Sequence, residues 1–163
     1  MGKFSSDNFP IFVGVCAKSA EGQILLDFCN GYAILSSMNK SVANWIKSSE
    51  YDIRTAKVME EGGRHIYVVF MCHLAVEKSL KAIVTKRTRK IPPKTHDLYY
   101  LIKLADLEVP FTYQKIISHL NQASIPTRYP EDIAKISRQY NKSVALKYLK
   151  ETQGLLRWLK KIK

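Results

Sequence analysis

The chain has 163 residues, of which 46% are hydrophobic, so it is long enough for one domain with a buried core. No apolar run approaches the roughly 20 residues of a membrane-spanning helix, and we expect a cytoplasmic protein with no membrane partner. The three cysteines have no CxxC spacing, which argues against a disulfide-stapled scaffold and indicates free thiols in a reducing compartment.

The positive charge is concentrated after residue 37. The formal net charge is +12, but residues 1–37 carry a net charge of −1, which leaves +13 to residues 38–163. A basic domain attracts the phosphates of nucleic acids or nucleotides, or an acidic partner protein, although charge can also serve solubility alone. We interpret residues 1–40 as a poorly defined N-terminal extension and residues 41–163 as the domain.

Apolar residues recur at helical spacing through the domain. The pattern predicts a first helix over residues 41–61, ended by a Gly-Gly pair, and a second over 64–86, ended by two prolines. Further helices are predicted over residues 96–105, 113–123 and 131–162. No stretch alternates with the period of a strand. Short connections and long apolar stripes therefore predict an all-α, antiparallel up-and-down bundle of four to five helices.

The second predicted helix carries a polar strip. His73, Glu77 and Lys81 are four residues apart, so they lie on one face of the helix. Glu77 and Lys81 could form an ordinary surface pair worth a few tenths of a kcal/mol, or they could lie between helices and face His96 and Arg128. His73 and Glu77 supply only two potential metal ligands and no HExxH motif, so we predict neither a metal site nor a cofactor.

Two predicted loops add cations next to helix starts. Thr95 is a plausible helix cap, and the basic residue before it could help to hold a phosphate at the helix N-terminus. In the second loop, Arg128 brings a planar cation that suits phosphate or carboxylate, and the next residue brings an aromatic ring. Both loops could instead be purely structural. The candidate binding residues are Glu77, Lys78, Lys81, Lys94, His96, Arg128 and Tyr129.

The last predicted helix has a basic surface with almost no acidic residues. Such a face is usually only solvated, but the shortage of acids favours an anionic partner. Its basic residues are Lys142, Lys147, Lys150, Arg157, Lys160 and Lys161.

Four segments in this order resemble the prokaryotic HEPN domain over about residues 41–160. They are YDIRTAKVM, AVEKSLKAI, PPKTHDL and PTRYPED, followed by the long last helix. The resemblance implies a compact helical bundle, commonly a dimer, whose gene often lies beside that of a small nucleotidyltransferase in a toxin–antitoxin pair. Some HEPN members are metal-independent ribonucleases, whereas others are thought to bind nucleotides or to serve as partner subunits.

The nuclease branch of this family carries an arginine and, four to six residues later, a histidine near the start of the last helix. Arg128 lies in that region, but no histidine follows it. Arg89 and His96 have the spacing, but two prolines separate them in a different loop. We therefore predict a non-catalytic, homodimeric subunit that binds a nucleotide or RNA and acts with a small nucleotidyltransferase partner. The alternatives are a ribonuclease toxin with a displaced catalytic site at His96 and Arg128, and a polar network that only fixes helix register.

Overall fold

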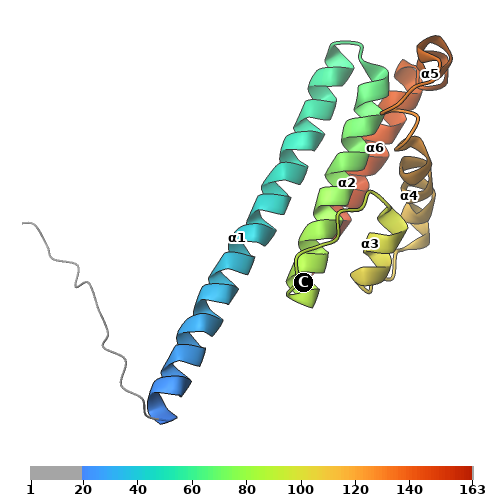
Figure 1. The fold of residues 1–163 in the computed structure, drawn as a ribbon. Helices are drawn as coiled ribbons and strands as arrows, with labels where there is room; N and C mark the ends of the chain where they lie inside the picture. Colours follow the sequence, from blue (N-terminus) through green and yellow to red (C-terminus); the bar gives the residue numbers. More distant parts are fainter. Residues whose placement is uncertain (1–19, 163) are drawn as a thin grey trace, which may run out of the picture. The chain divides into compact units, whose positions relative to one another are not determined.

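The computed structural model describes the backbone of residues 20–162 and the side chains of residues 37–162. The described residues form helices and no strand, which confirms the all-α prediction (Figure 1). The helices are α1 (Ala20–Glu61), α2 (His65–Thr88), α3 (Leu98–Leu104), α4 (Phe111–Ala123), α5 (Ile133–Gln139) and α6 (Lys142–Leu159). The chain divides into two compact units, residues 1–35 and 36–163. In the first unit only residues 20–35 are described, and they are helical; the second unit is the bundle.

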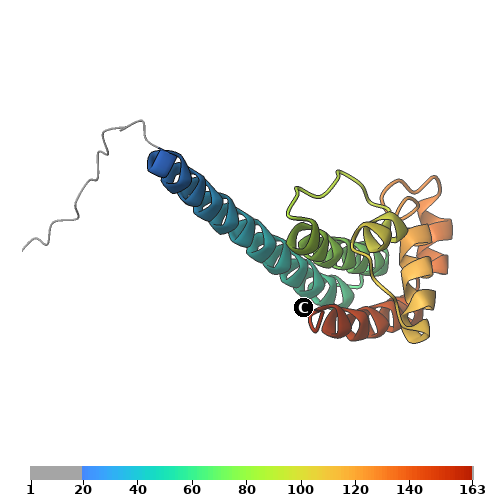
Figure 2. The same ribbon diagram turned by 90° about the horizontal axis from the view of Figure 1, so that it is seen from below.

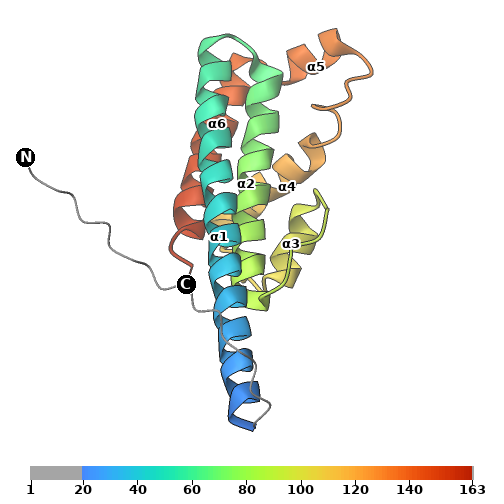
Figure 3. The same cartoon turned by 60° about the vertical axis from the view of Figure 1, so that its left-hand side comes forward.

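Helix α2 is the central helix of the bundle. It packs against α6, α3, α4 and α5, and Figure 3 shows it beside α6 and α1. Seen from below, α4 covers one side of the pair formed by α2 and α6 (Figure 2). A helix with apolar residues around most of its circumference is buried on most sides, and α2 follows this rule. Its fully buried side chains include Val68, Cys72, Val76 and Leu80. Tyr67 lies on the side of α2 that this buried set leaves exposed.

The turn between α1 and α2 has the chemistry expected from its glycine pair. Gly63 adopts the left-handed conformation (φ 69°), and the Arg64 N–H donates to the Met59 carbonyl at 2.7 Å. This bond back into the last turn is a common way to end a helix. At its other end, α1 starts at Ala20 rather than at residue 41 as predicted. No proline lies between residues 20 and 61, so nothing in the backbone prevents the helix from starting earlier.

The single predicted helix over residues 131–162 is wrong, because two helices, α5 and α6, occupy this range. Tyr140 leaves the helical conformation (φ −104°, ψ 59°). Asn141 then caps α6, since its Oδ1 accepts the Val144 N–H at 3.1 Å. The apolar periodicity continues across this break, which is why it did not reveal the break. Ile133, the first residue of α5, is exposed, and the described residues form six helices rather than four to five.

Candidate functional site

Glu77 is the centre of a polar cluster inside the bundle. It lies on α2 and is only 3% exposed. Lys81 Nζ donates to its Oε1 at 2.7 Å, and His96 Nδ1 lies 2.8 Å from its Oε2. Burial raises the pKa of the Glu77 carboxyl, but the hydrogen bonds from Lys81 and His96 outweigh it, so the pKa lies below its usual value. Glu77 is therefore an ionised carboxylate at neutral pH with both oxygens engaged.

His96 reaches Glu77 from the loop that follows the two prolines. Leu98 N–H, at the start of α3, donates to Asn121 Oδ1 at 2.9 Å, which ties this loop to α4. Because an ionised carboxylate only accepts hydrogen bonds, His96 Nδ1 carries the proton and donates it to Glu77. The His96 side chain is 57% exposed. Its second ring nitrogen, Nε2, is thus left on the far side of the ring for another partner.

Asp97 caps α3, rather than Thr95 as predicted. The Asp97 carboxylate accepts the N–H groups of Tyr99 and Tyr100, at 2.9 and 3.3 Å. The Thr95 hydroxyl instead accepts the Asp97 N–H at 3.2 Å, one step earlier in the chain. The hydrogen bonds of Thr95 and Asp97 hold the loop on either side of His96, whose ring contacts Glu77 of α2. The predicted helix start at residue 96 is accordingly two residues early.

His73, on α2, contacts the backbone of the same loop. It is fully buried, and burial lowers its pKa to about 4, so its ring is neutral at pH 7. Its Nε2 lies 3.1 Å from the His96 carbonyl oxygen. A carbonyl only accepts, so Nε2 carries the ring proton and Nδ1, which is 3.9 Å from Glu77 Oε2, is unprotonated. His73 was not among the candidate binding residues, although it belongs to the strip that the sequence singled out.

Arg128 approaches Glu77 from the loop after α4. The chain winds one further turn there, with the Thr127 and Arg128 N–H groups donating to the carbonyls of Ala123 and Ile125. The Arg128 side chain is 16% exposed, and its Nη2 lies 3.9 Å from Glu77 Oε2. Its guanidinium lies over the Phe70 ring, 5.2 Å from the centroid. Nε and Nη2 make no hydrogen bond to any described residue.

Four of the seven candidate residues therefore come together, namely Glu77, Lys81, His96 and Arg128. Lys78 points to α1, where its Nζ lies 2.6 Å from Asp52 Oδ2. Lys94 and Tyr129 are exposed, and among the described side chains neither forms a hydrogen bond or ion pair with Glu77. Whether the four clustered residues bind a ligand remains a prediction.

The HEPN domain model matches residues 42–162 of this chain. The chain belongs to the HEPN domain family. Two solved structures have folds similar to it. A protein from Thermus thermophilus is 25% identical, with a TM-score of 0.62, over 73% of this chain and 95% of that one. An archaeal HEPN homologue is 22% identical, with a TM-score of 0.60, over 73% of this chain and 94% of that one. A search of curated protein sequences found no match.

The charges in the polar cluster around Glu77 do not balance. One carboxylate, Glu77, faces two permanent cations, Lys81 and Arg128. The Lys81 Nζ atom also lies over the Trp45 ring of α1, 5.4 Å from its centroid. The two aromatic contacts were not predicted, because each joins residues far apart in the sequence. The cluster carries an excess of positive charge, and the arrangement suits an anion.

The described part of this HEPN chain has no cluster of metal-ligating side chains. No group of three histidine, cysteine or carboxylate side chains there could hold a metal ion. Separately, none of the helices in the described range has both the length and the apolar character of a transmembrane span.

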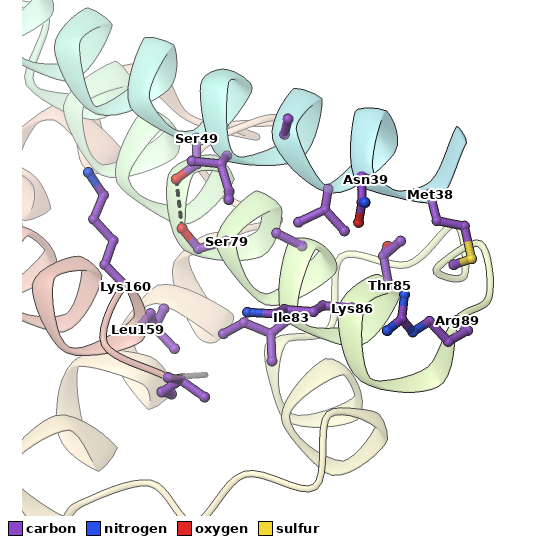
Figure 4. A pocket seen from close by; sticks show the side chains of 15 residues that line it. Met38, Asn39, Ser49, Ser79, Ile83, Thr85, Lys86, Arg89, Leu159 and Lys160 are labelled. Carbon is purple, nitrogen blue, oxygen red and sulfur yellow. Dashed lines mark hydrogen bonds between the residues drawn. The ribbon is translucent and has the colours of Figure 1, made fainter. Parts of the chain in front are cut away.

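A mainly apolar groove lies between α1, α2 and the end of α6, with a volume of about 300 Å³ (Figure 4). A hydrogen bond of 2.8 Å between the Ser49 and Ser79 hydroxyls lies at one end of it.

Arg89 and His96, which have the arginine–histidine spacing of the nuclease branch, lie in different places. Arg89 lines this groove, whereas His96 contacts Glu77. Within the described residues, no hydrogen bond or ion pair joins the Arg89 side chain to His96. The spacing between this arginine and histidine thus does not bring them into one cluster.

Proposed function

We propose that this HEPN protein is a non-catalytic subunit that binds the phosphate of a nucleotide or of RNA beside Arg128 and His96. One observation carries the proposal. Among the described residues, the Nε and Nη2 atoms of Arg128 are buried and have no hydrogen-bond partner, next to a carboxylate whose oxygens are already taken by Lys81 and His96.

The chemistry of the cluster fits a phosphate oxygen. A guanidinium is always charged and presents its donors in a planar fork that matches phosphate geometry. The flat face of the Arg128 guanidinium lies over the Phe70 ring, so Arg128 has little conformational freedom left to lose when a ligand binds. Lys81 neutralises Glu77, so the carboxylate does not repel an incoming anion at full strength. His96 contacts the same Glu77 oxygen that Arg128 approaches, and its largely exposed ring offers a second nitrogen to a ligand.

The partner part of the proposal rests on the family resemblance. HEPN genes often lie beside that of a small nucleotidyltransferase, and such domains are commonly dimers. We propose the same arrangement here: a cytoplasmic homodimer that acts with a nucleotidyltransferase in a two-gene, toxin–antitoxin-like system. Copurification of this chain with the product of the adjacent gene tests it. Recovery of the chain alone, at the mass of a monomer, would contradict it.

Binding of labelled ATP and of labelled RNA at two salt concentrations tests the phosphate site. We expect the wild-type protein to bind, and Arg128→Ala to bind at least about tenfold more weakly, because a charge-assisted bond is lost. Arg138→Ala is the matched control, since it removes an exposed arginine of α5. Equal binding by the wild type and Arg128→Ala would reject the site.

A second function, metal-independent RNA cleavage, is favoured by one specific contact. Glu77 engages Nδ1 of the exposed His96 ring, so Nε2 could act as a general base, and Arg128 could hold the phosphate. Incubation of RNA with the protein in EDTA distinguishes the two functions. The leading proposal predicts no cleavage above the level of His96→Ala. Cleavage by the wild type that His96→Ala abolishes would establish the ribonuclease instead.

A further inference from the structure

A second concave surface, which we name the α4–α6 groove, lies between these two helices and has a volume of about 620 Å³. Helices α4 and α6 pack against each other, and Figure 2 shows them side by side. Four basic side chains and one acidic side chain line the groove. They are Lys115, Lys147, Lys150, Arg157 and Glu151. The groove is therefore strongly positive, in agreement with the concentration of charge in the later part of the chain.

The cations of α6 form a row. Lys147, Lys150 and Arg157 lie three and seven residues apart, which places them on one face of the helix. At 1.5 Å per residue the row spans about 15 Å. Gly154 lies inside the row and contributes no side chain; a Cβ there would lie 3.7 Å from Tyr113 Cε1. The space over Gly154 is therefore occupied by the Tyr113 ring and the Arg157 side chain, and Lys115 lies on the α4 side of the groove.

Aromatic rings lie on the α4 side. Tyr113 lines the groove, and its ring packs on Trp158 with 5.7 Å between centroids, which fixes its orientation. Phe111, the first residue of α4, is two residues away and 88% exposed. The bundle interior does not use this ring. Phe111 adjoins Thr112, which lines the positively charged groove, and proteins bind single-stranded nucleic acid by stacking bases on exposed rings and pairing phosphates with cations.

We propose that the α4–α6 groove binds single-stranded RNA, with successive phosphates along Lys147, Lys150 and Arg157 and a base stacked on Phe111. This inference rests on the proposed function and extends it, because it assigns a polymer, rather than a mononucleotide, to this protein. A chain of regularly spaced negative charges matches the spaced cations of α6. An acidic protein is the competing partner, and the experiment separates the two.

The test is the affinity for a fluorescent 12-nucleotide oligouridylate, measured by anisotropy over a range of salt concentrations. Each phosphate contact contributes about 0.7 to the slope of log affinity against log salt for single strands, so Lys147→Ala/Lys150→Ala should lower the slope by about 1.4. Lys47→Ala/Lys135→Ala removes the same charge from exposed positions on α1 and α5 and should leave the slope unchanged. Phe111→Ala should weaken binding about fivefold or more at an unchanged slope.

The outcomes separate this inference from the phosphate site. RNA binding that the Lys147/Lys150 variant retains at the wild-type slope would overturn the groove assignment and leave the Arg128 site standing. Loss of slope in that variant, together with unchanged RNA binding by Arg128→Ala, would support the groove and reject the Arg128 site as a binding site for RNA. Polyglutamate that displaces the RNA as strongly as unlabelled oligouridylate, with no effect of Phe111→Ala, would show a site for acidic polypeptides and overturn the assignment.

Discussion

The Nδ1 atom of His96 lies 2.8 Å from Oε2 of Glu77, although 19 residues and a proline-containing loop separate the two. This contact gives Glu77 two roles. It holds together side chains from α2, from the loop before α3 and from the loop after α4, and it sets the charge that Arg128 faces. Changes at Glu77 should therefore affect the stability of the fold as well as the candidate site.

We expect Glu77→Gln to lower the free energy of unfolding by about 3–5 kcal/mol. Removal of one partner of a buried ion pair leaves the other charge uncompensated, and here both Lys81 and Arg128 lose their counterion. Urea denaturation measures the loss. Glu50→Gln is the control, because Glu50 makes an exposed pair with Lys160 that is worth about 1 kcal/mol or less. Similar small losses in both variants would show that the Glu77 cluster does not stabilise the bundle.

His73 should make stability depend on pH below neutrality. Its folded pKa is about 4, against about 6.5 in an unfolded chain. Between these values the unfolded chain binds a proton that the folded protein does not. The free energy of unfolding therefore falls as the pH drops from 6.5 toward 4, by an amount on the order of 3 kcal/mol. The lowered pKa of Glu77 acts in the same direction, since its stabilisation is lost as the pH falls through the folded pKa.

Urea denaturation at several pH values between about 7 and 4.5 checks the His73 prediction. His73→Gln retains a side-chain donor for the His96 carbonyl but cannot titrate, so its stability curve should be flatter over this range. Curves for the wild type and His73→Gln that run parallel would contradict the assignment of a buried, neutral His73.

The two glycines after α1 should respond differently to alanine. Gly63 has φ 69°, and a Cβ added there would meet no atom within 4 Å, so Gly63→Ala costs only backbone strain, about 1–2 kcal/mol. Gly62 lacks the left-handed conformation, and a Cβ there would lie 3.4 Å from the Val58 carbonyl oxygen. We expect Gly62→Ala to change stability by less than about 1 kcal/mol. Thermal unfolding of both variants measures the difference, and equal losses would contradict the role of Gly63 in the turn.

Local patterns were sufficient to predict the helical segments between residues 41 and 123 and the glycine turn, because these depend on neighbours along the chain. The i, i+4 strip of α2 also identified Glu77 and Lys81 correctly as a pair, since that spacing fixes their proximity. The same spacing could not show whether the pair is buried. Whether the pair is buried depends on whether the loops that carry His96 and Arg128 pack against this face of α2. The sequence contains no local signal for that packing.

The break between α5 and α6 and the contact of Lys78 with Asp52 both depend on details that the apolar pattern does not contain. Asn141 is a good helix cap, and its side chain could have revealed the break between α5 and α6, but the apolar period continues across it. Lys78 was assigned to the site because it adjoins Glu77, yet adjacent residues of a helix point about 100° apart, and Asp52 of α1 lies on its side. The apolar pattern did not reveal Asp52 because it is a buried polar residue.

The most direct test of the phosphate site follows the Arg128 Nε–H signal by ¹H–¹⁵N NMR while ATP is added. We predict a saturable shift of this signal and of the His96 ring, with the exposed Arg138 Nε–H unchanged as the internal control. If ATP shifts other signals to saturation while the Arg128 and His96 signals do not move, the result would contradict the claim that Arg128 binds phosphate beside Glu77.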